Sequence, residues 1–195
     1  PKIRGRFRSV PMQELLNEAK RLASEGVKEL VLVAQETTLY GKDLTGEKQL
    51  PLLLHELCKI EGIEWIRLLY CYPEEITDEL IKVIKTEEKV CNYIDMPIQH
   101  SENRILQRMG RRTSREDLVA VIKKLRKEIP DITIRTTLIT GFPGESQEDH
   151  EGLMNFVEEC QFDRLGVFTY SPEEDTLAAT FEAVSYTHLT LPTIR

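Results

Sequence analysis

Residues 30–34, Leu-Val-Leu-Val-Ala, form the continuous apolar, β-branched run that decides the fold class. This pattern is typical of a strand that is covered on both faces in a parallel sheet. The run follows an amphipathic segment whose apolar residues repeat at the helical period: Met12, Leu15, Leu16, Ala19, Leu22 and Ala23. Ser9 is expected to cap this helix, with Pro11 in its first turn and Gly26 after its end. A helix followed by a buried strand is the unit from which parallel α/β sheets are built.

The same alternation continues to residue 170. Further helices are expected at 51–60, 76–85, 104–109, from 114 onward and from Ser146 to Cys160, and further strands at 65–70, 93–96, 132–139 and 164–170. Ser146 and Asp149 have the spacing of a capping box, with Asp in place of Glu. The order predicts an α/β fold with about five parallel strands, arranged either as an open wound sheet or as a partial barrel.

The domain organisation is simple. No internal repeat or long linker interrupts residues 1–182, which are expected to form one domain. Residues 183–195 contain no acidic side chain, in contrast to the acidic stretch before them. We expect this tail to be non-native or disordered.

Composition and charge exclude several classes of function. The 195 residues carry a net charge of −7, whereas a domain that binds nucleic acid through bulk charge is expected to be basic. The apolar runs are far too short to span a membrane, and no leader-like segment opens the chain. The expected location is the cytoplasm, without a membrane partner.

The four cysteines, Cys58, Cys71, Cys91 and Cys160, are widely and irregularly spaced. No C-x-x-C pair occurs, so a zinc or iron–sulfur site built from this chain alone is not expected. We expect all four to be buried thiols.

Ligands of parallel α/β folds bind at the carboxyl ends of the strands, which makes the residues after each strand informative. The strongest candidate is the segment 139–145, Ile-Thr-Gly-Phe-Pro-Gly-Glu. Its glycines allow close approach of the backbone to a planar ligand or a phosphate, although a tight strand-to-helix turn explains them equally well. His100 is a weaker candidate for a general base, and His55 is expected to be structural.

Arginines gather in two stretches: Arg4, Arg6 and Arg8, and then Arg104, Arg108, Arg111, Arg112 and Arg115. Guanidinium groups suit carboxylates and phosphates, and they are also common on solvated surfaces. The residues alone leave both interpretations open.

Five motifs in order carry a family resemblance. They are Pro1-x-x-Arg4-Gly5-x-x-Arg8-Ser9, Ala34-Gln35-Glu36-Thr37-Thr38-x-Tyr40-Gly41, Pro97-Ile98-Gln99-His100-Ser101, Thr137–Glu145 and Tyr170-Ser171-x-Glu173-Glu174. Together they resemble the radical S-adenosylmethionine (SAM) methylthiotransferases, in the branch that modifies a ribosomal protein. The tRNA-modifying branch tends to read Gly-Gln-Asn at the second motif and Gln-Ser-Gly at the third.

The resemblance implies an incomplete (β/α)6 partial TIM barrel. The family holds a [4Fe-4S] cluster on the three cysteines of a C-x-x-x-C-x-x-C motif, and SAM occupies the open iron. An electron donor reduces the cluster, SAM is cleaved, and the resulting radical removes hydrogen from carbon. In the ribosomal branch, a methylthio group is added to the β-carbon of an aspartate in the small-subunit ribosomal protein S-twelve.

The resemblance also implies site residues. Gln35 and Glu36 correspond to positions near the methionine moiety of SAM, while Gln99 and Arg135 correspond to positions facing its ribose or carboxylate. The segment at Ile139, Gly141, Phe142 and Gly144 corresponds to the adenine site. Arg4 and Arg8 correspond to supports of the cluster loop.

The sequence departs from the family in two respects. The cysteine motif and the first barrel strand are not present, so we expect the chain as given to be inactive and poorly soluble. Asp175 and Leu177 stand where the family commonly has Gly and a small residue or Pro. Two alternatives stay open: a tRNA methylthiotransferase, and a non-catalytic barrel that binds a nucleotide-like ligand.

Overall fold

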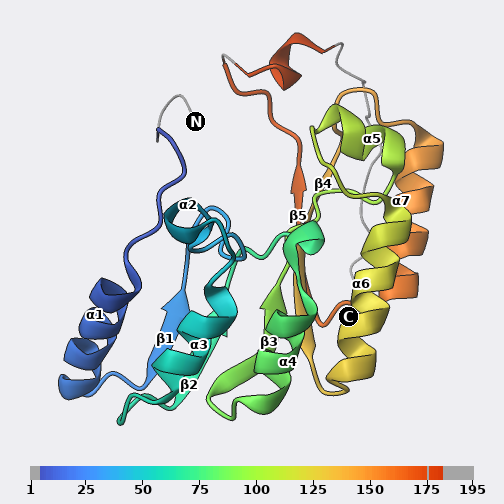
Figure 1. Cartoon of the computed structure of the whole chain (residues 1–195). Coiled ribbons are helices and arrows are strands. Elements are labelled where there is room, and N and C mark those ends of the chain that lie inside the picture. The colour runs from blue at the N-terminus through green and yellow to red at the C-terminus, as the bar shows by residue number, and fades with distance from the viewer. Residues whose placement is uncertain (1–4, 175, 182–195) are drawn as a thin grey trace.

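The computed structural model describes residues 5–174 and 176–181. Its centre is one sheet of five parallel strands in the order β1-β2-β3-β4-β5 (Figure 1). The strands are β1 (Glu29–Leu32), β2 (Trp65–Leu68), β3 (Val90–Asp95), β4 (Thr133–Thr140) and β5 (Arg164–Thr169). Sequential strands are neighbours throughout, as expected for a barrel wall. The α/β prediction is confirmed.

The helices alternate with the strands. They are α1 (Met12–Ser24), α2 (Lys42–Thr45), α3 (Leu50–Cys58), α4 (Asp78–Thr86), α5 (Asn103–Arg108), α6 (Arg115–Glu128) and α7 (Gln147–Cys160), with 3₁₀ turns at Pro73–Glu75 and Ala178–Thr180. The sequence pattern did not indicate α2 or the two 3₁₀ turns, because one turn is too short to show a period. The longer elements match the expected ones to within about three residues.

One face of the sheet packs against the helices. The buried apolar strand residues of this face are Leu30, Ile66, Leu68, Val90, Ile94, Ile134 and Leu138. Burial of such side chains contributes roughly 1.5–3 kcal/mol each, so this layer supplies the main stabilisation of the fold.

The other face of the sheet is open, which makes one expectation wrong. Val31 and Val33 are 46% and 61% exposed, so the run at 30–34 is not covered on both faces. Trp65 and Phe168 lie exposed on further strands of the sheet. The continuous apolar run is typical of a barrel wall, but no described element covers its inner side.

The cap predicted for the first helix is also wrong. Pro11 is the N-cap residue of α1 and provides no side-chain cap. The Ser9 hydroxyl instead donates to Asp43 Oδ1 at 2.6 Å and accepts from the Gly41 amide at 3.0 Å. Ser9 therefore ties the N-terminal segment to α2. The capping box predicted at Ser146 and Asp149 is confirmed.

The cysteines follow the expectation only in part. Cys71 and Cys160 are buried, whereas Cys58 and Cys91 are half-buried. Burial raises the pKa of Cys58 and of Cys160 to about 11. These thiols therefore stay protonated at neutral pH. Among the described residues, no helix is long and apolar enough to cross a membrane.

Candidate functional site

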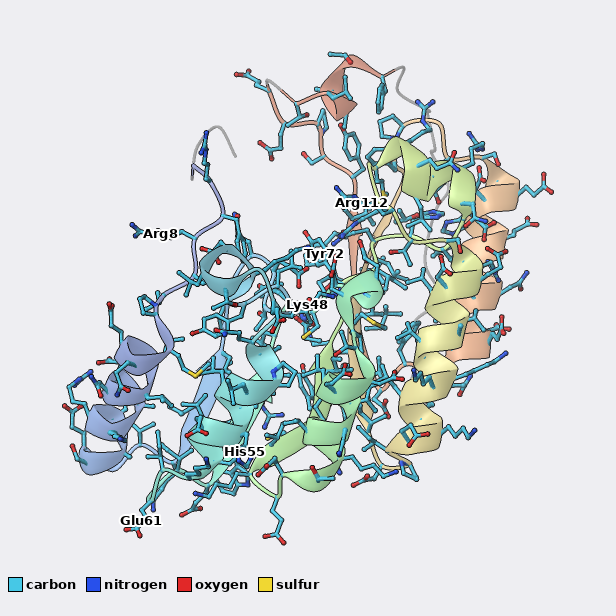
Figure 2. The ribbon with its side chains drawn as sticks, viewed as in Figure 1. Arg8, Lys48, His55, Glu61, Tyr72 and Arg112 are labelled. Carbon is cyan, nitrogen blue, oxygen red and sulfur yellow. The ribbon has the colours of Figure 1, made fainter. Side chains whose placement is uncertain are left out.

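A cavity of about 780 Å³ lies at the carboxyl ends of the strands. It is lined by residues that follow each of the five strands, namely Leu39, Tyr72, Gln99, Phe142 and Phe181, by Ile139 at the end of β4, and by the α5–α6 loop. Figure 2 shows Tyr72 and Arg112 at this end of the sheet. Three of the expected site residues, Gln99, Ile139 and Phe142, thus meet in one cavity.

A second cavity of about 440 Å³ lies beside β1. It contains Glu36 and Arg8, together with Phe7, Val31, Val33 and Tyr40. Arg8 is exposed, and Arg4 lies outside the described residues. Gln35 is exposed and lines neither cavity described here, so its expected placement gains no support from the fold.

Glu36 is a buried carboxylate with one open oxygen. Glu36 is only 7% exposed. Oε1 accepts from the Thr38 amide at 2.9 Å and from the Tyr72 amide at 3.4 Å, while Oε2 has no partner. Burial raises the pKa of Glu36, against these hydrogen bonds. An unpartnered buried acceptor is costly unless a ligand donates to it.

Gln99 owes its place to an unusual backbone. Its φ is +73°, in the left-handed region that L-residues other than Asn, Asp and Gly rarely adopt. In this conformation the Gln99 amide donates to Thr137 O at 2.9 Å, and the Ile139 amide donates to Gln99 O at 2.7 Å. The segment after β3 is thereby paired to β4 at the floor of the cavity.

The loop after β4 is shaped by its two glycines. Gly141 and Gly144 have φ values of +73° and +88°, and a Cβ at Gly144 would lie 2.9 Å from the Arg108 guanidinium. The Phe142 amide donates to Glu145 Oε2 at 3.0 Å, and the Phe142 ring meets the Tyr170 ring edge-on at 5.2 Å. The loop is therefore a strand-to-helix turn that also places Phe142 at the cavity, and its contact with a ligand stays a prediction.

Beneath this loop lies a buried polar cluster that sequence reasoning missed. Glu145, His100 and His150 are each at most 7% exposed. Glu145 Oε1 lies 3.2 Å from His150 Nδ1 and 3.7 Å from His100 Nε2, and Thr140 Oγ1 lies 3.1 Å from His150 Nδ1. His100 is thus a structural group under the loop and not a solvent-facing base. The sequence signal was the unexplained Glu at the end of the glycine turn.

Arg135 lies on the open face of the sheet. Its Nη1 lies 2.5 Å from Oδ1 of Asp95, a fully buried carboxylate whose Oδ2 accepts from the Tyr70 amide at 3.1 Å. Asp95 raises the pKa of Arg135 further. Arg135 lines neither cavity described here, so its expected contact with a ribose or carboxylate stays a prediction.

The second arginine stretch divides by position. Arg104 and Arg115 pair with Asp149 and Glu102, away from the cavity. Arg108, Arg111 and Arg112 line the cavity. His55, expected to be structural, is exposed and pairs with Glu87 at 2.7 Å.

Metal ligands do not converge in the part of the chain that the structure describes. No group of three or more His, Cys, Asp or Glu side chains there could hold a metal ion.

Known proteins match this chain in sequence. A model of the radical SAM superfamily matches residues 1–157. A ribosomal protein uS12 methylthiotransferase RimO from Lachnoclostridium phytofermentans is 67% identical over 179 residues, which cover 92% of this chain and 41% of that protein. The protein of the same name from Clostridium perfringens strain SM101 is 59% identical over 182 residues, again 41% of its length. The chain thus spans well under half of these curated relatives.

Solved structures match the fold at low identity. The methyltransferase TsrM from Kitasatospora setae, described as a radical S-adenosylmethionine enzyme with cobalamin and a [4Fe-4S] cluster, gives a TM-score of 0.65 at 17% identity, covering 82% of this chain and 31% of that one. The coproporphyrinogen III oxidase HemN from Escherichia coli gives 0.62 at 20% identity, covering 82% and 37%. At these identities the matches support the fold alone.

Proposed function

The chain belongs to the radical SAM superfamily, and from this premise we propose that it forms the SAM-binding wall of a methylthiotransferase that modifies a ribosomal protein. The observation that carries the proposal is the 67% identity to a uS12 methylthiotransferase over 179 residues. The geometry supports it, because four of the residues that resemble SAM-binding positions line the two cavities: Gln99, Ile139 and Phe142 the larger one and Glu36 the smaller one.

The described residues fit SAM. The open Oε2 of Glu36 suits the ammonium group of a methionine moiety, because a buried carboxylate oxygen without a donor favours a cationic partner. Ile139 and Phe142 offer an apolar surface for an adenine ring, and the left-handed glycines flank it. Gln99 supplies an amide beside them.

An iron–sulfur cluster does not fit the described residues, since none of the cysteines converge. In the full-length protein, SAM and a cluster would supply the radical that removes hydrogen from carbon. The part of this chain is to bind and orient SAM, to keep the Glu36 carboxylate aimed at it and to exclude water with the apolar floor.

The proposed substrate is the β-carbon of an aspartate in ribosomal protein uS12. Residues 35–38, Gln-Glu-Thr-Thr, and 99–101, Gln-His-Ser, differ from the pattern of the tRNA-modifying branch. The names of the relatives support ribosomal protein uS12 as the substrate, and the aspartate is what the family resemblance implies.

The test uses the full-length protein, purified without oxygen and supplied with iron, sulfide, a reductant and SAM. A synthetic peptide of the uS12 target loop and its Asp→Asn twin are incubated with it, and products are identified by mass spectrometry. We expect a methylthio group on the aspartate peptide only. Modification of an adenosine in tRNA, with an untouched peptide, would support the tRNA alternative instead. Binding of SAM with no product on either substrate would favour a non-catalytic barrel.

A further inference from the structure

The α5–α6 loop places at the rim of the larger cavity a cation, Arg112, that pairs with no other residue the structure describes. Five charged side chains line this cavity: Glu74, Glu75, Arg108, Arg111 and Arg112. A charged side chain that already forms an ion pair or hydrogen bond within the protein is less available to bind a ligand. The partners of each of the five side chains therefore indicate which of them could bind one.

The two acidic side chains are occupied. Glu74 Oε2 accepts from the Thr113 hydroxyl at 2.8 Å. Glu75 Oε2 pairs with Lys48 Nζ at 2.5 Å, and the same lysine donates to the Glu75 carbonyl at 3.3 Å. Neither carboxylate therefore lacks a partner.

Two of the three arginines are occupied as well. Arg108 donates from Nε to Pro143 O at 3.0 Å and lies over the Phe181 ring at 4.7 Å. Arg111 donates from Nη2 to Pro97 O at 3.2 Å and lies over the Tyr72 ring at 5.0 Å. Each combines a carbonyl and an aromatic face, a structural use of the guanidinium.

Arg112 differs from its neighbours. Among the described residues, its exposed side chain has no hydrogen bond, ion pair or aromatic contact. The residues on both sides are anchored, Arg111 to Pro97 and Thr113 to Glu74, so the backbone of Arg112 is held in place. Figure 2 shows Arg112 above Tyr72, at the carboxyl end of the sheet.

We propose that Arg112 binds the side-chain carboxylate of the substrate aspartate, an inference that rests on the function proposed above. A guanidinium matches a carboxylate in a two-pronged geometry, and a fixed backbone lowers the entropy lost on binding. The carboxylate of SAM is the competing source of the same chemistry. The resemblance places Arg135 at the ribose or carboxylate of SAM and Glu36 near its methionine moiety, and neither residue lines the larger cavity, so the Arg112 cation at this rim is left for the substrate.

The experiment measures binding in the full-length protein with its clusters reconstituted. Fluorescence anisotropy gives the Kd of the uS12 loop peptide and of its Asp→Asn twin at saturating SAM, and calorimetry gives the Kd of SAM. The variants are Arg112→Ala, Arg112→Lys and the control Lys123→Ala, which removes an exposed cation from α6 outside the cavity.

We expect the wild type to prefer the aspartate peptide. Arg112→Ala is expected to raise the Kd of the aspartate peptide by about ten- to a hundredfold, because a charge-assisted hydrogen bond is lost. The Kd of the asparagine peptide and that of SAM should not change. Arg112→Lys should retain part of the preference, and Lys123→Ala should retain all of it.

Three outcomes overturn the inference. They are an unchanged preference in Arg112→Ala, a loss of SAM affinity in place of peptide affinity, and a wild type without preference. If the wild type still methylthiolates the aspartate peptide in any of these cases, the proposed function survives and only the role of Arg112 fails. If the peptide is never modified, both fall.

Discussion

His100 Nε2 lies 3.7 Å from Glu145 Oε1, and both side chains are completely buried. The two residues follow different strands, β3 and β4, and Glu145 also accepts from the Phe142 amide in the cavity loop. The carboxylate that holds the Phe142 amide is therefore also in contact with a histidine 45 positions earlier in the chain.

Replacing His100 should destabilise the protein. His100→Ala leaves a buried carboxylate with fewer partners and also removes the acceptor of the Glu102 amide, at 3.0 Å from Nδ1. We expect a loss of about 2–4 kcal/mol in the free energy of unfolding, measured by chemical denaturation at pH 7. The control His55→Ala breaks the exposed pair with Glu87 and should cost less than about 1 kcal/mol. Equal losses in both variants would contradict the role of the buried cluster.

Glu145 and Glu36 should give opposite pH dependences. Burial opposes ionisation of Glu145, but contacts with His100, His150 and the Phe142 amide hold its pKa below the ordinary 4.5. Since the unfolded state then binds the proton more tightly, the stability due to Glu145 is present above pH 4.5 and is lost as the pH falls through the folded-state pKa. Glu145→Gln should abolish this loss of stability at acidic pH, and the melting temperature of the variant should fall less than that of the wild type below pH 4.5.

Glu36 has a pKa raised above 4.5, chiefly by burial. Its favourable contribution is therefore full below pH 4.5 and is lost as the pH rises through the folded-state pKa. The melting temperature of Glu36→Gln relative to the wild type should rise between pH 4.5 and 7. The same variant should lower the affinity for SAM by tenfold or more, because a neutral amide cannot form an ion pair with the proposed ammonium partner. Unchanged SAM affinity would argue against placing the methionine moiety at Glu36.

The backbone of Gln99 should favour glycine. With φ at +73°, Gln99→Gly should be about 1 kcal/mol more stable than Gln99→Ala, as measured by denaturant unfolding. Gln161, at φ +47° after α7, is a matched control and should show a similar difference between its Gly and Ala variants. Only the Gln99 variants should change ligand affinity, since Gln99 lines the cavity. A Gln99→Ala variant that is more stable than Gln99→Gly would contradict the backbone strain inferred at this position.

Removing Arg135 alone should destabilise the protein more than removing the charges of both Arg135 and Asp95. Arg135→Met leaves the buried Asp95 with only the Tyr70 amide and should destabilise by about 2–4 kcal/mol. Adding Asp95→Asn should recover part of the loss, because the buried charge is then gone. Additive losses in the double variant would show that the two side chains do not act as a pair.

Much of the fold could be predicted from local pattern. The helix from Ser114 and the capping box at Ser146 follow from signals that act within one turn of chain. The strand at 30–34 was predicted correctly, but the prediction that both of its faces are covered was wrong. An apolar run indicates that a residue is suited to burial, and it does not say whether an element of this chain covers each face.

The sequence by itself determined the alternation of helices and parallel strands, and thereby which loops gather at the carboxyl edge. Period and capping are local, and a parallel sheet brings all its strand ends to one side. Only the tertiary structure decided which side chains meet there. Three features depend on strand register and loop geometry between distant segments, which no local pattern encodes: the pairing of His100 with Glu145, the open oxygen of Glu36, and the Arg112 guanidinium, which has no partner among residues 5–174 and 176–181.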